Sequence, residues 1–114
     1  MIQPQESLRA RTRAGETLLG CFITWPVSGV VELAAIAGFD FVVLDGEHGF
    51  FSIESAASAV VAADAAGIAA IVRAPSAVSE QLGRYLDAGA AGTLLPRVES
   101  TAMARAAIEA LKFA

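Results

Sequence analysis

The 114-residue sequence is poor in reactive side chains. It contains one cysteine, one histidine and one tryptophan, and eight basic residues stand against twelve acidic ones. The single cysteine, Cys21, excludes an intrachain disulfide, and residues 1–6 form no apolar signal region, so we expect a cytoplasmic protein. The net charge of −4 argues against nucleic acid or an anionic membrane surface as a partner. The only local concentration of positive charge, Arg9, Arg11 and Arg13, is interpreted as a solvated helix face.

The sequence also lacks an uninterrupted hydrophobic run long enough to cross a membrane. The most apolar later stretch, residues 56–72, is broken by Asp64 and Gly67 and is too polar at its centre for a span. Hydrophobic residues nevertheless make up 55 % of the chain, above the roughly 45–50 % of an average globular protein. We therefore expect one small domain whose apolar content exceeds the needs of a free-standing monomer.

One pattern, in which a short apolar strand leads through a loop into a helix that ends at glycine, recurs along the chain. The expected strands cover residues 18–24, 39–44, 69–72 and 92–95. The expected helices cover residues 4–14, 30–37, 53–66, 80–88 and 101–111. The candidate N-caps are Ser28, Ser52, Ser79 and Ser100, and the glycines that follow helices are Gly15, Gly38, Gly67 and Gly89. Continuously apolar strands of this length are typical of parallel sheets that are covered on both faces.

Four consecutive βα units predict an α/β fold with right-handed crossovers. Two architectures satisfy this pattern, an open doubly wound sheet and part of a (β/α)₈ barrel. The periodicity does not choose between them. The absence of a glycine-rich phosphate-binding fingerprint argues only against a nucleotide-binding version of the open sheet.

Polar side chains gather where the expected strands end. Asp45, Glu47 and His48 follow the second strand, and Arg73 follows the third. Because the carboxyl ends of parallel strands share one edge, we expect these side chains to converge. The other candidates at the strand ends are Thr24, Trp25, Arg97 and Glu99. Arg97 and Glu99 are interpreted as rim residues that pair with each other or with solvent.

Each candidate has a functional and a structural interpretation. His48 suits proton transfer near neutral pH, or it is a structural histidine. Arg73 either binds a substrate carboxylate or forms a structural salt bridge with Asp45 or Glu47. Asp45 can cap the following loop, and Glu47 is interpreted as a surface residue. Asp87 is expected in the last turn of a helix, where the dipole disfavours an anion; it is either a solvated acid or a residue that orients a histidine.

Four motifs together carry a family resemblance that extends from about Gly15 onward. They are residues 37–49 (AGFDFVVLDGEHG), 71–75 (IVRAP), 85–90 (YLDAGA) and 94–99 (LLPRVE). In this order they resemble the metal-dependent (class II) pyruvate aldolases of the 4-hydroxy-2-oxoheptanedioate and 2-keto-3-deoxy-sugar-acid type, which share a superfamily with the citrate lyase beta subunit.

The resemblance implies a (β/α)₈ barrel and reversible cleavage of a 4-hydroxy-2-oxo acid to pyruvate and an aldehyde. It implies that His48 is the general base, that Arg73 binds pyruvate and stabilises the enolate, and that Asp87 pairs with His48. Asp45 would lie near metal-bound water, and Trp25 could line the substrate site. The family uses a divalent cation, such as Mg²⁺, Mn²⁺ or Co²⁺, but its ligands follow the fifth and sixth strands, which this chain does not contain.

We therefore expect residues 1–114 to form a single partial barrel, the first half of a (β/α)₈ TIM barrel. Its expected partners are a small 2-oxo acid and either further copies of the chain or the C-terminal half of the barrel. Two alternatives remain open at this point. One is a non-catalytic half-barrel that serves as an assembly module, and the other is a different enolate-forming enzyme on the citrate lyase side of the superfamily.

Overall fold

The computed structural model describes residues 7–78 and 80–112. Within them, four strands alternate with helices in the expected order. The strands are β1 (Gly20–Ile23), β2 (Phe41–Asp45), β3 (Ala69–Arg73) and β4 (Gly92–Leu94). The helices are α1 (Leu8–Arg13), α2 (Ser28–Ile36), α3 (Ile53–Ala66), α4 (Leu82–Asp87) and α5 (Thr101–Lys112). The prediction of consecutive βα units is therefore confirmed.

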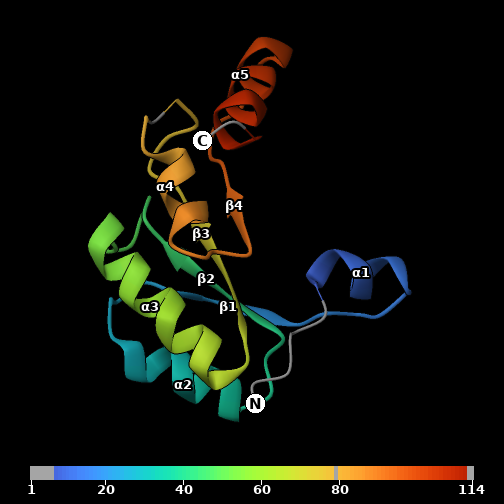
Figure 1. The fold of residues 1–114 in the computed structure, drawn as a ribbon, viewed down its shortest axis with the longest axis vertical. Helices are drawn as coiled ribbons and strands as arrows, with labels where there is room; N and C mark the ends of the chain where they lie inside the picture. The colour runs from blue at the N-terminus through green and yellow to red at the C-terminus, as the bar shows by residue number, and fades with distance from the viewer. Residues whose placement is uncertain (1–6, 79, 113–114) are drawn as a thin grey trace.

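The strands form one parallel sheet in the order β1-β2-β3-β4. Figure 1 shows α2, α3 and α4 together on one side of this sheet. The strand residues that pack into the core on that side are Ile23, Val42, Leu44, Ala70 and Val72. Every crossover leads to the adjacent strand, whereas a doubly wound sheet reverses its strand order at a switch point. The topology thus selects the barrel segment over the open sheet.

The opposite face of the sheet is not covered by α2, α3 or α4. The residues that alternate with the core positions, and so lie on this uncovered face, are Phe22, Val43, Asp45, Ile71 and Arg73. Phe22 is 53 % exposed there. In the register of β2 and β3, Asp45 is the partner of Arg73, so an acid and a base lie side by side at the carboxyl end of the sheet.

Most of the predicted helix ends are confirmed. The Ser52 hydroxyl accepts the Ser55 N–H at the start of α3, and Ser55 reciprocates, which makes a capping box. Gly67 ends this helix with a φ of 77°, which lies in the left-handed region that favours glycine. Ser100 also caps as predicted, because its hydroxyl accepts the Met103 N–H.

The Ser28 prediction is wrong. Ser28 is already the first helical residue of α2, and the cap position is Val27, which has no side-chain acceptor. The backbone of Val27 is extended there, and its carbonyl oxygen accepts the Val30 N–H, so the turn forms without a polar cap. Ser79 lies outside the described residues, and α4 begins three residues later, at Leu82.

The N-terminal helix is shorter than the expected 4–14, of which residues 4–6 lie outside the described part. Ser7 caps α1 by accepting the Ala10 N–H. The interpretation of its arginines as a purely solvated face is wrong for Arg11, which donates to Glu16 and, at 2.7 Å, to Asp40. Asp40 also accepts the Leu19 N–H, so this pair ties α1 to the entrance of the sheet.

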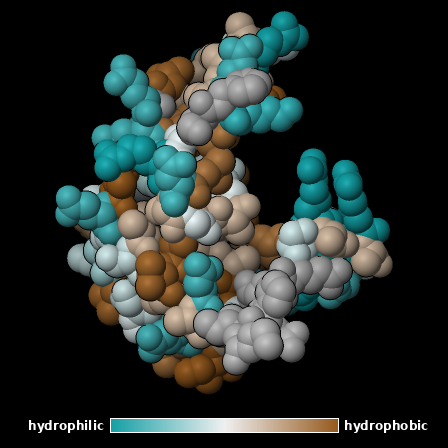
Figure 2. Space-filling model, viewed as in Figure 1, coloured by the Kyte–Doolittle hydropathy of each residue, from teal (hydrophilic) through white to brown (hydrophobic). Residues whose placement is uncertain are grey.

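Several large apolar side chains remain on the surface. Leu33 and Ile36 project from the outer side of α2 and are exposed. Figure 2 shows hydrophobic surface at the lower end of the molecule, where α2 lies in Figure 1. None of the described helices combines the length and the apolarity that crossing a bilayer requires.

Candidate active site

Asp45 ends β2 and is 2 % exposed. Its Oδ1 accepts the backbone N–H groups of Glu47 and His48, each at 3.0 Å, so the carboxylate folds the loop back onto the strand end. The Gly46 N–H donates to the Arg73 carbonyl oxygen at 2.8 Å and ties the same loop to β3. Asp45 thus acts as the loop cap that one interpretation predicted, and it fixes where the Glu47 and His48 side chains begin.

Arg73 donates to the same carboxylate from the neighbouring strand. Its Nε lies 3.0 Å from Oδ1 of Asp45 and its Nη2 lies 2.5 Å from Oδ2. The guanidinium holds the pKa of the Asp45 carboxyl well below its usual range, although burial acts in the opposite direction, and the carboxylate raises the pKa of Arg73. The guanidinium also lies 4.8 Å from the centre of the Phe22 ring, on the uncovered face of the sheet.

The salt bridge expected as the structural alternative for Arg73 is therefore present. This salt bridge uses only some of the N–H donors of the Arg73 side chain. A guanidinium carries five N–H groups, and Asp45 accepts from Nε and Nη2. No acceptor in the described part of the chain pairs with Nη1, which can donate to another anion, so the two interpretations of Arg73 are compatible.

Glu47 is not the surface residue that the sequence suggested. Its side chain is only 12 % exposed, and Oε1 lies 3.3 Å from Nε2 of His48 and 3.7 Å from Nε of Arg73. No local sequence signal identifies it, because its partners Arg73 and Arg97 lie on β3 and after β4. His48 itself is on the open side of this group, with 67 % of its side chain exposed.

Arg97 lies on the rim, as expected, but its ion pair is with Glu47 rather than with Glu99. Its Nε lies 3.8 Å from Oε2 of Glu47, while 78 % of its side chain is exposed. The backbone of Arg97 has a φ of 53°, a left-handed conformation that is uncommon outside glycine. This turn directs the segment after β4 toward the loop that follows β2.

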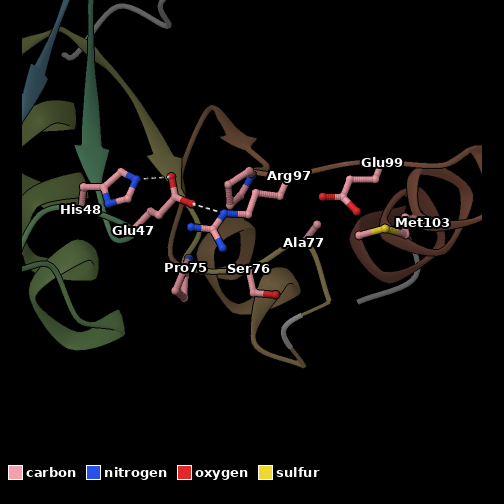
Figure 3. Close-up of a pocket in the computed structure, with 9 residues that line it drawn as sticks. Glu47, His48, Pro75, Ser76, Ala77, Arg97, Glu99 and Met103 are labelled. Carbon is pink, nitrogen blue, oxygen red and sulfur yellow. Dashed lines mark ion pairs between the residues drawn. The ribbon is translucent and has the colours of Figure 1, made fainter.

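A cavity of about 490 Å³ opens beside His48. Figure 3 shows its walls: His48 and Glu47 lie on one side, Arg97 lies between them and Glu99, and Met103 of α5 stands opposite. Segments from three strand ends therefore meet around one space. The remaining lining residues are Pro75, Ser76, Ala77 and Pro96.

Trp25 and Asp87 are not brought to this cavity. Trp25 follows the end of β1 and stacks on Phe50, with ring centres 4.5 Å apart, but it is not among the lining residues. Asp87 is the last residue of α4 and is exposed. Because helices of βα units run back toward the amino ends of the strands, Asp87 and His48 belong to opposite ends of the sheet. No ion pair joins them among the described residues.

A metal ion would need donors that this part of the chain does not assemble. Among residues 7–78 and 80–112, no three His, Cys, Asp or Glu side chains lie close enough to hold a metal ion. Two acids of the site face arginines instead, Asp45 toward Arg73 and Glu47 toward Arg73 and Arg97. These residues alone do not fit a divalent cation.

Cys21 is not part of this site. It is partly buried and packs against the core. Burial raises the pKa of its thiol, which disfavours the thiolate that nucleophilic chemistry requires. Cys21 is therefore a packing residue of the core.

The parallel sheet, its helix-covered outer face and the polar group at the strand ends define a segment of a (β/α) barrel with a candidate active site. Residues 18–114 match the HpcH/HpaI aldolase/citrate lyase family. The chain belongs to this family, as its four motifs predicted.

Similar proteins carry aldolase names. The hydroxypyruvate/pyruvate aldolase of Roseobacter denitrificans is 29 % identical over 113 residues, and the 4-hydroxy-2-oxovalerate aldolase of Novosphingobium aromaticivorans is 31 % identical over 114 residues. Each alignment covers 99 % of this chain but 44 % of the relative. The chain thus spans less than half the length of these curated relatives.

The same proportion appears in three dimensions. The crystal structure of the HpcH/HpaI aldolase from Desulfitobacterium hafniense superposes with a TM-score of 0.84 at 28 % identity, covering 92 % of this chain and 41 % of the other. The prediction that the chain corresponds to half of an aldolase barrel is confirmed.

Proposed function

We propose that this chain supplies the proton-transfer and anion-binding half of a class II pyruvate aldolase site. The observation that carries the proposal is the group at the carboxyl ends of β2 and β3. There, Asp45 fixes both the loop of His48 and the guanidinium of Arg73. The aldolase names of the relatives support the reaction class. The expected substrate is a 4-hydroxy-2-oxo acid, and the expected products are pyruvate and an aldehyde.

In this proposal His48 accepts a proton from the substrate, and Arg73 stabilises the negative charge that the same reaction creates. His48 takes the proton of the C4 hydroxyl, and the C3–C4 bond breaks. The aldehyde leaves, and the electron pair of the broken bond forms the pyruvate enolate. Arg73 offers its remaining N–H donors to the carboxylate and to the charge that develops on the enolate oxygen. The proton then returns to C3 to give pyruvate.

The other expected residues have supporting places in the proposal. Asp45 fixes the loop and the arginine, while Trp25 and Asp87 remain assignments implied by the resemblance. A divalent cation would polarise the 2-oxo group, and in the family its ligands come from strands beyond those of this chain. No step assigned to His48 or Arg73 depends on a metal ion held by residues 1–114.

Deuterium exchange at the methyl group of pyruvate tests the proposal. The chain is incubated in D₂O with pyruvate and Mg²⁺, Mn²⁺ or Co²⁺, alone and with the separately produced remaining segment of the Novosphingobium relative. Exchange should appear in the second arm and fall by about 10²–10⁴-fold in His48→Ala, the usual contribution of a general base. Glu32→Gln, on the exposed part of α2, should leave the rate unchanged.

The same assay decides the competing interpretation. The uncovered sheet face and the incomplete donor set favour a non-catalytic assembly module for the chain taken by itself. If exchange is absent in both arms although the two segments associate, the aldolase proposal fails and the module interpretation stands.

A further inference from the structure

The Glu47 carboxylate is the point where three basic groups of the site meet. Its Oε1 faces Nε2 of His48 at 3.3 Å and Nε of Arg73 at 3.7 Å, and its Oε2 faces Nε of Arg97 at 3.8 Å. These partners come from the loop after β2, from β3 and from the segment after β4. Because only 12 % of the side chain is exposed, these contacts are weakened less by solvent than those of a surface ion pair.

The burial of the pair is asymmetric. Glu47 is largely enclosed, whereas 67 % of the His48 side chain is exposed. In the described part of the chain, Glu47 supplies the one carboxylate contact of the imidazole. An exposed ring without such a partner would exchange between rotamers. A mobile base lowers the rate of the chemical step, because the reacting atoms must be held in near-contact geometry.

We propose that Glu47 is a positioning residue that holds the His48 imidazole beside Arg73, so that base and anion-binding group face one 2-oxo acid from the same side. This inference rests on the proposed function of His48 and Arg73. Glu47 touches neither substrate nor reacting atom; it acts through the ring of His48.

The role of Glu47 differs from that of Asp45 in a way that can be measured. Arg73 is held by two hydrogen bonds to Asp45, so it keeps its place when Glu47 is removed. Within residues 7–78 and 80–112, His48 has no such second support. Loss of Glu47 should therefore slow the chemical step while leaving the binding of the 2-oxo acid carboxylate nearly intact.

Nuclear magnetic resonance of the 114-residue chain tests the positioning directly. His48 is the only histidine, so the imidazole Cε1–H signal needs no assignment. Its order parameter should fall in Glu47→Ala and be partly retained in Glu47→Gln, which keeps an acceptor oxygen. Glu99→Ala, which removes another acid that lines the cavity but lies beyond Arg97 from His48, should leave it unchanged. Backbone amide spectra confirm that each variant is folded.

Kinetics of methyl exchange in the two-segment assay supply the second readout. Glu47→Ala should lower kcat by about tenfold to a hundredfold, the range known for carboxylate partners that orient metal-binding histidines, with KM for pyruvate nearly constant. An unchanged order parameter of the His48 ring in Glu47→Ala overturns the inference, as does a rise in KM with constant kcat. If the unmutated protein shows no exchange, the proposed function fails, whereas the order parameter still decides whether Glu47 positions His48.

Discussion

Nη2 of Arg73 lies 2.5 Å from Oδ2 of Asp45, and the two residues are register partners on adjacent parallel strands. The pair closes the carboxyl end of the sheet on its uncovered face. Since Asp45 also accepts two backbone N–H groups, one buried carboxylate joins two strands and a loop. Its loss should therefore affect stability as well as the site.

Asp45→Asn should destabilise the folded chain by about 1.5–3 kcal/mol, because Arg73 and the two loop N–H groups lose charge-assisted hydrogen bonds to a buried carboxylate. Equilibrium unfolding in urea measures this difference. Asp64→Asn is the matched control, because it makes the same chemical change at an exposed position of α3. Equal midpoints for the two variants would contradict a stabilising role of the pair.

The depressed pKa of Asp45 predicts a specific dependence of stability on pH. In the unfolded chain an aspartate has a pKa of about 3.9, whereas hydrogen bonding to Arg73 keeps the folded carboxyl ionised at lower pH. The unfolded state therefore binds more protons in this interval. The contribution should be complete above pH ~4 and lost as the pH falls from there toward the folded pKa. Unfolding free energies measured across this interval should lose part of their slope in Asp45→Asn, and an unchanged slope would refute the assignment.

Gly49→Ala should disturb the loop that carries His48. A Cβ at this position would lie 2.5 Å from the Asp45 carbonyl oxygen and 2.9 Å from that of Thr24, so the backbone must shift. We expect a loss of about 1–3 kcal/mol, as for other overpacked sites. Gly29→Ala is the control: the added Cβ meets nothing within 4 Å, and in a helix it should stabilise by about 0.5–1 kcal/mol. Thermal unfolding of the two variants measures this difference. A chain destabilised by Gly29→Ala but not by Gly49→Ala would contradict the prediction.

The isolated chain should self-associate. The sheet face with Phe22 and Leu94 is open to solvent, and both residues are exposed. The outer strands β1 and β4 each have one neighbour in the sheet, which leaves edges available for pairing. Sedimentation velocity should detect species heavier than the monomer, and Leu94→Lys should weaken association more than Ile36→Lys on α2. A strictly monomeric chain at every concentration would exclude this behaviour.

Much of this arrangement could be predicted from the sequence, because its causes are local. Apolar runs that stop at polar residues gave the strands, and glycines such as Gly67 mark the helix ends by a requirement of their own backbone. The convergence of Asp45 and Arg73 also followed, since parallel strands present their carboxyl ends at one edge. The family resemblance then predicted that these units belong to a (β/α)₈ barrel.

The remaining features depend on distant groups. The burial of Glu47 results from neighbours on β3 and after β4, which its own loop does not encode. The left-handed backbone of Arg97 is another example, because a positive φ at a non-glycine residue is uncommon and its residue type does not predict it. Ser28 is a false cap signal, because its hydroxyl stands one residue inside the helix.

The pairing of Asp45 with Arg73 also bears on how the chain selects one alignment of its strands. Sliding β2 by one residue would turn all its side chains over, carrying Asp45 into the apolar layer where Leu44 now packs beneath the helices. An ionised carboxylate there would have no partner, and burial of an unpaired charge is strongly unfavourable. Arg73 would be orphaned at the same time. The two charges therefore favour the native register during folding, because a sheet misaligned by one residue would bury an unpaired carboxylate and also leave Arg73 without its partner.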